Sequence, residues 1–315
     1  MSAAESVFCA CAPGLEPLLA GELRELGLGA RPVPGGAEAE GVDAAAMACL
    51  ASRLADSVLL RLWTGDAAEL PAARRAAARR AGGAELLVRP AGRASTLSVD
   101  AAGEPLHRRG WRARVGAAPL RETLAAALLR AGGWAGDRPF LDPMCGSGTV
   151  AIEAALAAAG RAPGLERPLA LERLPGHDPA RLARLRAALA GRARPVKVPI
   201  HASDRNAGAL RLAQKNAAAA GVAELVTFAR EDAGRVRPPD GPGLLAVNPP
   251  YGVRLDEGTR EAWQALASLL ARLGGWTAVV LGPDRGLEKL LPAAPAEALA
   301  VRNGGLACRL LVYRP

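Results

Sequence analysis

Cysteines are few in this chain of 315 residues, and their spacing forms no paired motif. The five cysteines are odd in number and include no Cys-x-x-Cys sequence, which indicates a reduced, cytoplasmic setting. Cys9 and Cys11 alternate with Ala10 on an expected strand, so they are interpreted as core residues, and no metal site is predicted. No basic stretch followed by an apolar block opens the chain, and no run of about 18 uncharged apolar residues occurs. The sequence therefore predicts neither export nor a membrane span.

Apolar and positively charged residues are abundant. Half of the residues are hydrophobic, which is enough for the cores of two ordinary domains. The formal net charge is +9, and residues 71–115 alone hold ten arginines against three acidic residues. Concentrated positive charge favours polyanion binding, because phosphate neutralisation releases counterions. An Arg-rich helix surface exposed to solvent is the alternative interpretation.

The stretch LDPMCGSGT, residues 141–149, is typical of a strand, loop and helix that bind a nucleotide. Gly146 and Gly148 lack a Cβ, so a ligand can lie on the backbone while the helix directs unpaired N–H groups at it. Dehydrogenases carry a third glycine about three residues further on. Val150 or Ala151 occupies that place here. A nicotinamide oxidoreductase would also have no use for the motif Asn-Pro-Pro-Tyr at residues 248–251.

A second motif, Asn248-Pro249-Pro250-Tyr251, lies roughly a hundred residues later, at the end of the apolar run 244–247. An ordinary Pro-rich turn is the alternative interpretation. The two motifs together resemble a class I S-adenosylmethionine-dependent methyltransferase that acts on an exocyclic amino group. The loops after two neighbouring strands are then expected to meet, one holding the methyl donor and the other the amine.

The second motif suits transfer to a nucleobase amine. The exocyclic amine of a nucleobase is a poor nucleophile because its lone pair is delocalised into the ring. The Asn248 side-chain oxygen and the Pro249 carbonyl can accept hydrogen bonds from the two N–H groups of this amine, which localises the lone pair on its nitrogen. Two prolines fix the direction of these carbonyls, and Tyr251 can stack on a flipped base. The candidate catalytic residues are Asn248, Pro249, Pro250 and Tyr251.

Acidic residues at further strand ends are candidates for binding the nucleoside part of the cofactor. Asp204 follows the expected strand 198–203, where a carboxylate can hydrogen-bond both ribose hydroxyls. Capping the helix 206–220 is its alternative role. Asp232 follows the expected strand 225–229 and can reach the adenine amine, although an acidic pair in a loop is usually only solvated.

The glycine loop is expected to hold the methionine part of the cofactor, with Asp142 and Thr149 organising the loop. The predicted cofactor-binding residues are Asp142, Pro143, Met144, Cys145, Gly146, Ser147, Gly148, Thr149, Asp204, Arg205, Asp232, Ala233 and Asn248.

The segment LHRRGWRAR, residues 106–114, places Trp111 among four arginines. A Trp ring between guanidinium groups can stack an unpaired base while the charges hold phosphates. A hinge in which Trp111 packs against the next domain is the alternative, and both can hold. The predicted RNA-binding residues are Arg75, Arg79, Arg108, Arg109, Trp111 and Arg112.

Strands alternate with helices, which predicts an α/β fold with a mostly parallel sheet covered on both faces and a hairpin-like ending. A boundary near Gly116 divides an α+β N-terminal RNA-binding domain, residues 1–115, from the methyltransferase domain, residues 116–315. A Gly- and Pro-rich turn is expected at residues 34–36. Residues 161–197 are too long for a simple connection, so they are interpreted as an insertion over the sheet edge or near the site.

Longer phrases resemble one family. LHRRGWR, APLRETLAAALL, LDPMCGSGTVAIEAA, NPPYGVRL, NGGLACRLL and the opening FCACAPGLEPLLAGELRELG are similar to bacterial 23S ribosomal RNA guanine-N2 methyltransferases of the RlmL type. The likeness spans most of the chain. It implies a class I methyltransferase Rossmann-like sheet with an antiparallel last strand, S-adenosylmethionine as cofactor and RNA as substrate.

The resemblance also implies a THUMP RNA-binding domain before HRRG. Residues 63–106 are about half as long as that domain requires, so a ferredoxin-like, reduced THUMP-like domain is predicted. RNA capture then rests on the Arg-rich segment or on a partner protein. Arg121 stands where the family more often has lysine, which keeps the charge but not the geometry.

Other functions fit parts of the pattern. A tRNA guanine-N2 methyltransferase would use the same site, and a DNA adenine methyltransferase shares Asn-Pro-Pro-Tyr but needs a larger region for reading sequence. A catalytically silent RNA-binding ribosome-assembly factor would keep the fold without needing the motif. A monomer is the favoured oligomeric state.

Overall fold

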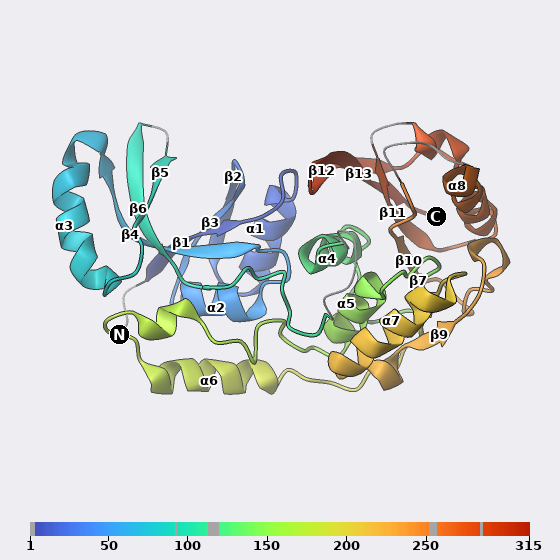
Figure 1. Ribbon diagram of the computed structural model, residues 1–315, viewed down its shortest axis with the longest axis horizontal. Coiled ribbons are helices and arrows are strands. Elements are labelled where there is room, and N and C mark those ends of the chain that lie inside the picture. The colour runs from blue at the N-terminus through green and yellow to red at the C-terminus, as the bar shows by residue number, and fades with distance from the viewer. Residues whose placement is uncertain (1–3, 92, 113–119, 252–256, 284–285) are drawn as a thin grey trace. The chain divides into compact units, whose positions relative to one another are not determined.

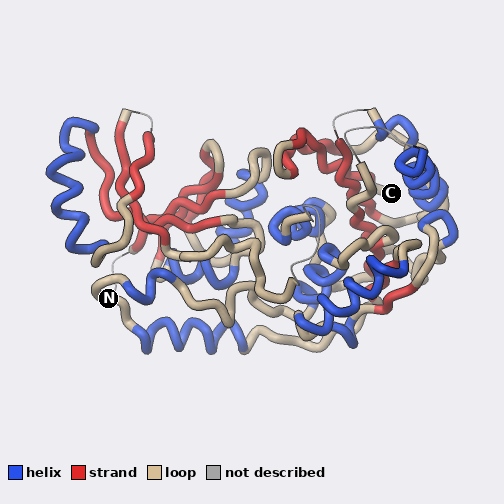
Figure 2. Tube along the Cα trace, viewed as in Figure 1, coloured by secondary structure: helices blue, strands red, loops and turns tan. Residues whose placement is uncertain are grey.

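The computed structural model shows two compact units, residues Met1–His107 with Ala162–Arg192, and residues Arg108–Arg161 with Ala193–Pro315 (Figures 1 and 2). The boundary expected near Gly116 falls outside the described residues. No helix in the described part of the chain combines the length and the apolar character that crossing a bilayer requires. The described residues are 4–91, 93–112, 120–251, 257–283 and 286–315.

The first unit contains a six-stranded antiparallel sheet with the strand order β2-β3-β1-β4-β6-β5. Leucines at helical spacing, among them the fully buried Leu19 and Leu23, give α1 one apolar face. Its elements are β1 (Glu5–Ala10), α1 (Glu16–Glu25), β2 (Gly29–Val33), β3 (Gly36–Gly41), α2 (Ala44–Ala51), β4 (Ser57–Asp66), η1 (Ala67–Glu69), α3 (Leu70–Ala81), β5 (Leu87–Ala91), β6 (Ala94–Asp100), η2 (Ala170–Arg173) and α6 (Pro179–Ala190).

Residues Ala162–Arg192 belong to this first unit. The main-chain N–H of Gly164 donates to the Leu50 carbonyl at 2.9 Å, and that of Leu171 donates to the Ala101 carbonyl at 3.0 Å. The expectation that residues 161–197 cover the nucleotide-binding sheet or its site is therefore wrong for this segment. Its helix α6 completes the ferredoxin-like unit, and the local sequence pattern does not reveal which sheet such a segment joins.

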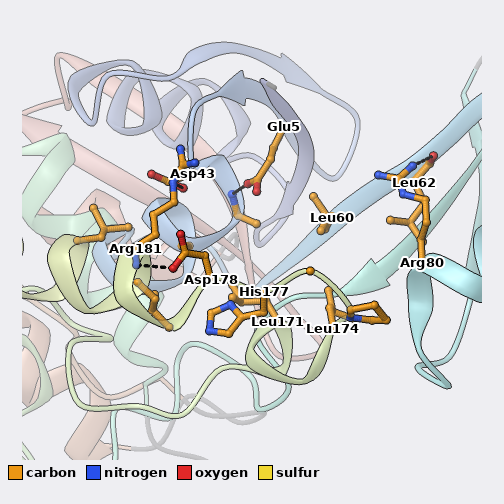
Figure 3. A pocket seen from close by; sticks show the side chains of 16 residues that line it. Glu5, Asp43, Leu60, Leu62, Arg80, Leu171, Leu174, His177, Asp178 and Arg181 are labelled. Atoms are coloured by element: carbon orange, nitrogen blue, oxygen red, sulfur yellow. Dashed lines mark hydrogen bonds and ion pairs between the residues drawn. The ribbon is translucent and has the colours of Figure 1, made fainter. Parts of the chain in front are cut away.

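A cavity of about 230 Å³ lies within the first unit, between the sheet and this segment (Figure 3). Six leucines line it together with polar and charged residues, and the two arginines among them have partners within the unit. The Arg181 guanidinium forms an ion pair with Asp43, and Arg80 donates to the Leu62 carbonyl at 2.8 Å. None of the residues predicted to form a site lines this cavity.

The second unit contains a seven-stranded sheet with the order β12-β13-β11-β10-β7-β8-β9. The five strands from β11 to β9 in that order are mutually parallel, and β13 runs antiparallel to β11 and β12. All four residues of β10 are fully buried, as expected for a parallel strand covered on both faces. Its elements are α4 (Glu122–Ala131), β7 (Phe140–Asp142), α5 (Thr149–Ala158), β8 (Ile200–Ser203), α7 (Ala207–Ala219), η3 (Ala223–Leu225), β9 (Thr227–Ala229), η4 (Ala233–Arg235), β10 (Leu244–Val247), α8 (Glu257–Leu270), β11 (Thr277–Pro283), η5 (Leu287–Leu290), β12 (Glu297–Asn303) and β13 (Leu306–Tyr313).

The order of strands changes direction between β7 and β10. From β7 the chain proceeds outward through β8 to β9, then returns to place β10 on the other side of β7. Ligands of open α/β sheets bind at the carboxyl ends of the strands beside such a switch point. The loops after β7 and β10 are therefore neighbours, although about a hundred residues separate them in the sequence.

Candidate active site

The glycine loop after β7 adopts the sharp turn that the sequence predicts. Gly146 has a φ of 53° and Gly148 a φ of 84°, a region that residues with a Cβ rarely adopt. A Cβ at Gly146 would meet no atom within 4 Å, so open space lies beside it. A Cβ at Gly148 would meet the Ala213 Cβ at 3.0 Å. Gly146 therefore borders a space for a ligand, whereas Gly148 permits close packing against α7.

Asp204 connects the end of β8 to this loop. Its Oδ2 accepts from the Gly146 N–H at 2.9 Å, and its Oδ1 accepts from the Asn206 N–H at 2.8 Å. The cap of α7 is Asn206, whose side chain accepts from the N–H groups of Gly208 and Ala209. The alternative role for Asp204, a helix cap, is therefore wrong.

Asp142 is deeply buried beneath the loop, with 1% of its surface exposed. Burial raises the pKa of this carboxyl to about 8; the Met144 N–H lowers the pKa, and the charge of Asp204 raises it. Asp142 Oδ1 accepts from the Met144 N–H at 3.4 Å, while Oδ2 has no hydrogen-bond partner within the described residues. Asp142 thus organises the loop from below as an uncharged acid near neutral pH.

One cavity of about 770 Å³ brings the two motifs together. Pro143, Met144 and Gly146 of the first loop line it, and so does the entire Asn-Pro-Pro-Tyr motif after β10. Asp204, Arg205, Asp232 and Ala233 also line it. Five predicted cofactor-binding residues do not line it: Asp142, which ends β7, then Cys145, Ser147 and Gly148 in the loop, and Thr149 at the start of α5.

The loop after β10 is held from below. The Trp263 side chain in α8 is completely buried, and its Nε1 donates to the Pro250 carbonyl at 3.1 Å. The Asn248 Oδ1 atom is buried and has no hydrogen-bond partner within the described residues. An unsatisfied buried acceptor costs about 1–3 kcal/mol, so a donor from a ligand in the cavity would stabilise it. Asn248 therefore combines a fixed position with an available acceptor.

Sequence reasoning missed part of the cavity wall. Asn303 donates from Nδ2 to the Tyr251 hydroxyl at 2.7 Å, and burial raises the pKa of Tyr251 above its usual range, so the phenol is neutral. The turn of the β12–β13 hairpin, which contains Asn303, is the missed element. In the sequence, the only signal for this turn is the phrase NGGLACRLL, which carries the family resemblance but does not indicate a place in the site. The missed lining residues are Leu120, Arg121, Asn206, Ala262, Ala265, Asn303, Gly304, Gly305 and Leu306.

Three of the predicted RNA-binding residues are engaged inside the second unit. The Trp111 side chain is only 7% exposed, so stacking of a base on this ring is contradicted. Arg109 pairs with Glu153 at 3.3 Å, with 3% and 0% of these side chains exposed. Arg112 donates to Glu122 at 2.9 Å and to the Thr149 hydroxyl at 3.0 Å. These carboxylates on α4 and α5 explain why the arginines lie inward.

The other predicted RNA-binding residues are exposed. Arg75 and Arg79 lie on α3 of the first unit, whose buried residues Ala73 and Ala77 mark the opposite face. Arg108 is exposed in the segment before Trp111. The positive surface expected from the sequence therefore remains on α3, while the HRRGWR segment is mainly structural.

The strand order, the glycine loop and the Asn-Pro-Pro-Tyr loop identify the second unit as a class I S-adenosylmethionine-dependent methyltransferase. Residues 109–311 match the RMKL-like methyltransferase domain, and residues 6–59 match the RlmL ferredoxin-like domain. The chain therefore belongs to the RMKL-like methyltransferase family, and its cofactor is S-adenosylmethionine. The predicted fold class and cofactor are confirmed.

Individual relatives agree with this assignment. The chain is 41% identical over 229 residues to the ribosomal RNA large subunit methyltransferase K/L of Vibrio campbellii. The aligned stretch covers 69% of this chain and 32% of that protein. The chain thus spans about a third of the length of this relative. The crystal structure of SMU.472 complexed with SAH has 23% identity and a TM-score of 0.87, covering 100% of this chain and 99% of the other. A Listeria monocytogenes protein described, by prediction, as an N6-adenine-specific DNA methylase has 26% identity and a TM-score of 0.86, covering 99% and 96%.

Proposed function

We propose that the protein transfers a methyl group from S-adenosylmethionine to the exocyclic N2 amine of a guanine in 23S ribosomal RNA. One observation carries this proposal: Asn248, whose buried Oδ1 has no hydrogen-bond partner within the described residues, lines the same cavity as Gly146 and Asp204. The name of the Vibrio relative supports ribosomal RNA as the substrate. A cytoplasmic location and a monomeric state belong to the same proposal.

The cofactor supplies a methyl group on a positively charged sulfur. In the proposal, Asp204 hydrogen-bonds the ribose, and Asp232, whose Oδ1 accepts from the Gly234 N–H at 2.9 Å, lies beside the adenine. Pro143, Met144 and Gly146 contact the methionine part. The remaining loop residues, including Thr149, act by fixing the loop rather than by touching the ligand.

The loop after β10 presents the amine. Asn248 Oδ1 and the Pro249 carbonyl accept the two N–H groups, which localises the nitrogen lone pair and directs it at the methyl group. Tyr251 stacks on the base. The nitrogen–carbon bond forms as the sulfur–carbon bond breaks, and the amine then loses its extra proton to water or to a carbonyl acceptor. Catalysis is mainly positioning, so no strong general base is required.

RNA capture is assigned to the N-terminal domain, taken as residues 1–115, which we propose acts as a reduced THUMP-like module. The exposed Arg75 and Arg79 on α3 supply the positive charge of the first unit, and Arg108 is a separate exposed positive charge before Trp111. Arg109 and Arg112 are left out of the proposed RNA contacts because they pair with Glu153 and Glu122. Salt-dependent phosphate contacts supply the affinity.

Methylation of defined RNA pools tests the proposal. The purified protein is incubated with labelled S-adenosylmethionine and, separately, with unmodified 23S rRNA transcript, a tRNA transcript pool and double-stranded DNA. Digestion to nucleosides should place the label in N2-methylguanosine from 23S rRNA. Label in tRNA guanosine or in DNA N6-methyladenine would replace the proposed substrate with one of its rivals. Cofactor binding without any transfer would support a silent assembly factor instead.

A further inference from the structure

The turn of the β12–β13 hairpin lines the cavity that contains the Asn-Pro-Pro-Tyr motif. Asn303, Gly304, Gly305 and Leu306 all lie on its wall. Strand β12 is at the edge of the sheet and is separated from β10 by β13 and β11. The hairpin therefore reaches the cavity only through its turn, which the Arg302 guanidinium stabilises by donating to the Gly305 carbonyl at 3.1 Å.

Asn303 restrains the ring of Tyr251. Its Nδ2 donates to the Tyr251 hydroxyl at 2.7 Å, although the two residues are 52 positions apart in the sequence. Below this loop, Trp263 already fixes the Pro250 carbonyl. Tyr251 is thus held at its backbone side by α8 and at its ring tip by the hairpin. A ring that is ordered before binding loses less conformational entropy when a base stacks on it.

Leu306 adds an exposed apolar group to the wall of the same cavity. It is 37% exposed, and only two other large apolar side chains in the described residues, Val42 and Val88, are exposed to this degree. Neither of those lines the cavity of the two motifs. Gly304 and Gly305 present no side chain, and a Cβ at either would meet no atom within 4 Å. The turn therefore offers open space together with one apolar side chain.

We propose that this turn is the outer wall of the target-nucleotide site, in which Asn303 positions Tyr251 for stacking and Leu306 packs against the same base. The inference rests on the proposed transfer to a nucleobase amine, but it does not depend on which RNA carries that base. Asn303 is a positioning residue, because it acts through the Tyr251 hydroxyl. Leu306 contributes contact with the base.

A double-mutant cycle on labelled methyl transfer to 23S rRNA transcript tests the role of Asn303. Asn303→Ala and Tyr251→Phe should each lower kcat/KM by about three- to tenfold, which corresponds to one lost hydrogen bond. The double variant should be no worse than Tyr251→Phe alone, because both changes remove the same interaction. Independent, multiplicative losses would overturn the positioning role.

One measurement, one control variant and one substitute variant separate this role from damage to the fold. Affinity for S-adenosylhomocysteine, measured by calorimetry, should be unchanged in Asn303→Ala. Glu297→Gln is the matched control, since Glu297 lies at the far end of β12 and pairs only with Arg314 in the interactions seen there. Should Asn303→Ala fail to fold, Asn303→Ser replaces it in the cycle, because serine suits turns.

The proposed contact between Leu306 and the base is tested by varying the size of the side chain at position 306. Leu306→Ala should raise KM for RNA by about three- to tenfold with little change in kcat, as expected for a lost apolar contact, whereas Leu306→Met should be close to the wild type. Val42→Ala is the control for loss of an exposed apolar group elsewhere. An unchanged KM in Leu306→Ala would remove this residue from the site. A wild-type protein that methylates none of the nucleic acids tested would overturn the proposed function and this inference together, whereas an active wild type with multiplicative losses would overturn the inference alone.

Discussion

The Asp204 carboxylate accepts a hydrogen bond from the main-chain N–H of Gly146, with 2.9 Å between nitrogen and Oδ2. This contact joins the ends of two adjacent parallel strands, β8 and β7. Of the two glycines in the loop motif, Gly146 is the one with open space beside it, and this contact holds it in place. Asp204 therefore shapes the glycine loop in the absence of a ligand. Under the proposed function, removing its carboxylate is expected to affect both this loop and the binding of the cofactor.

Asp204→Ala should weaken binding of S-adenosylhomocysteine by about 10- to 100-fold, the value of one or two hydrogen bonds to a charged group. Isothermal calorimetry measures the affinity. Asp240→Ala is the control, because Asp240 is an exposed acid of the same unit outside the cavity. Equal affinities for the two variants would remove Asp204 from the proposed site.

Asn248→Ala should lower kcat on the order of 100-fold, comparable to the loss of one transition-state hydrogen-bonding group, while cofactor affinity and the melting temperature stay nearly constant. The reason is that Asn248 Oδ1 has no hydrogen-bond partner within the described residues, so its removal breaks no hydrogen bond to that atom there. Single-turnover methyl transfer gives the rate. Gln264→Ala, on the exposed face of α8, is the control. Equal turnover by the Asn248 variant would overturn the assigned role.

The sequence predicts the two loops well because each follows a short apolar run that can only be a buried strand. Asn248 and Gly146 are placed in one cavity by strand order, which apolar periodicity and the family resemblance both indicate. The Gly- and Pro-rich turn at residues 34–36 is also confirmed. Strands β2 and β3 on its two sides are not predicted, because small and charged residues such as GAEAEG have weak strand preference. Strand β3 forms by pairing with β1 on one side and β2 on the other.

Long-range polar pairs account for most of the remaining differences. Trp111 and the arginines around it look like a base-stacking surface in the sequence, because the carboxylates that pair with these arginines lie elsewhere in the chain. Glu122 is 10 residues from Arg112, and Glu153 is 44 residues from Arg109. Tyr251 and Asn303 are likewise 52 residues apart. A local pattern gives the charge of a segment but not the direction in which its side chains point. That direction depends on partners supplied by other elements.

Asp142→Asn should make stability less dependent on pH. Burial raises the pKa of Asp142 to about 8, above its ordinary value of 3.8, so the folded chain retains a proton that the unfolded chain releases. The wild type therefore loses stability as the pH rises from about 4 to about 8, by an amount on the order of a few kcal/mol. Melting temperatures at pH 5, 7 and 9 should show the variant gaining on the wild type up to about pH 8. A constant difference across this range would contradict the raised pKa.

Charge reversal on α3 should weaken RNA binding. Arg75→Glu with Arg79→Glu removes two exposed positive charges, so affinity for 23S rRNA transcript should fall. The slope of the logarithm of the binding constant against the logarithm of the salt concentration should become shallower by about two or more. Binding isotherms at several salt concentrations measure both quantities. Arg184→Glu, an exposed residue on α6, controls for net charge. An unchanged slope in the α3 variant would exclude this helix from the RNA surface.

Arg109→Ala should destabilise the fold instead of acting on RNA. Its guanidinium and the Glu153 carboxylate are almost completely buried and lie 3.3 Å apart, so Arg109→Ala takes this ion pair away from a buried carboxylate, at a cost of up to about 3–5 kcal/mol. Arg109→Met combined with Glu153→Leu should recover much of this loss, because both charges are then gone. Urea unfolding measures the free energies, and Arg108→Ala, at the exposed neighbouring position, should change stability by less than about 0.5 kcal/mol. A normally stable Arg109→Ala variant with weakened RNA binding would restore the base-stacking interpretation of this segment.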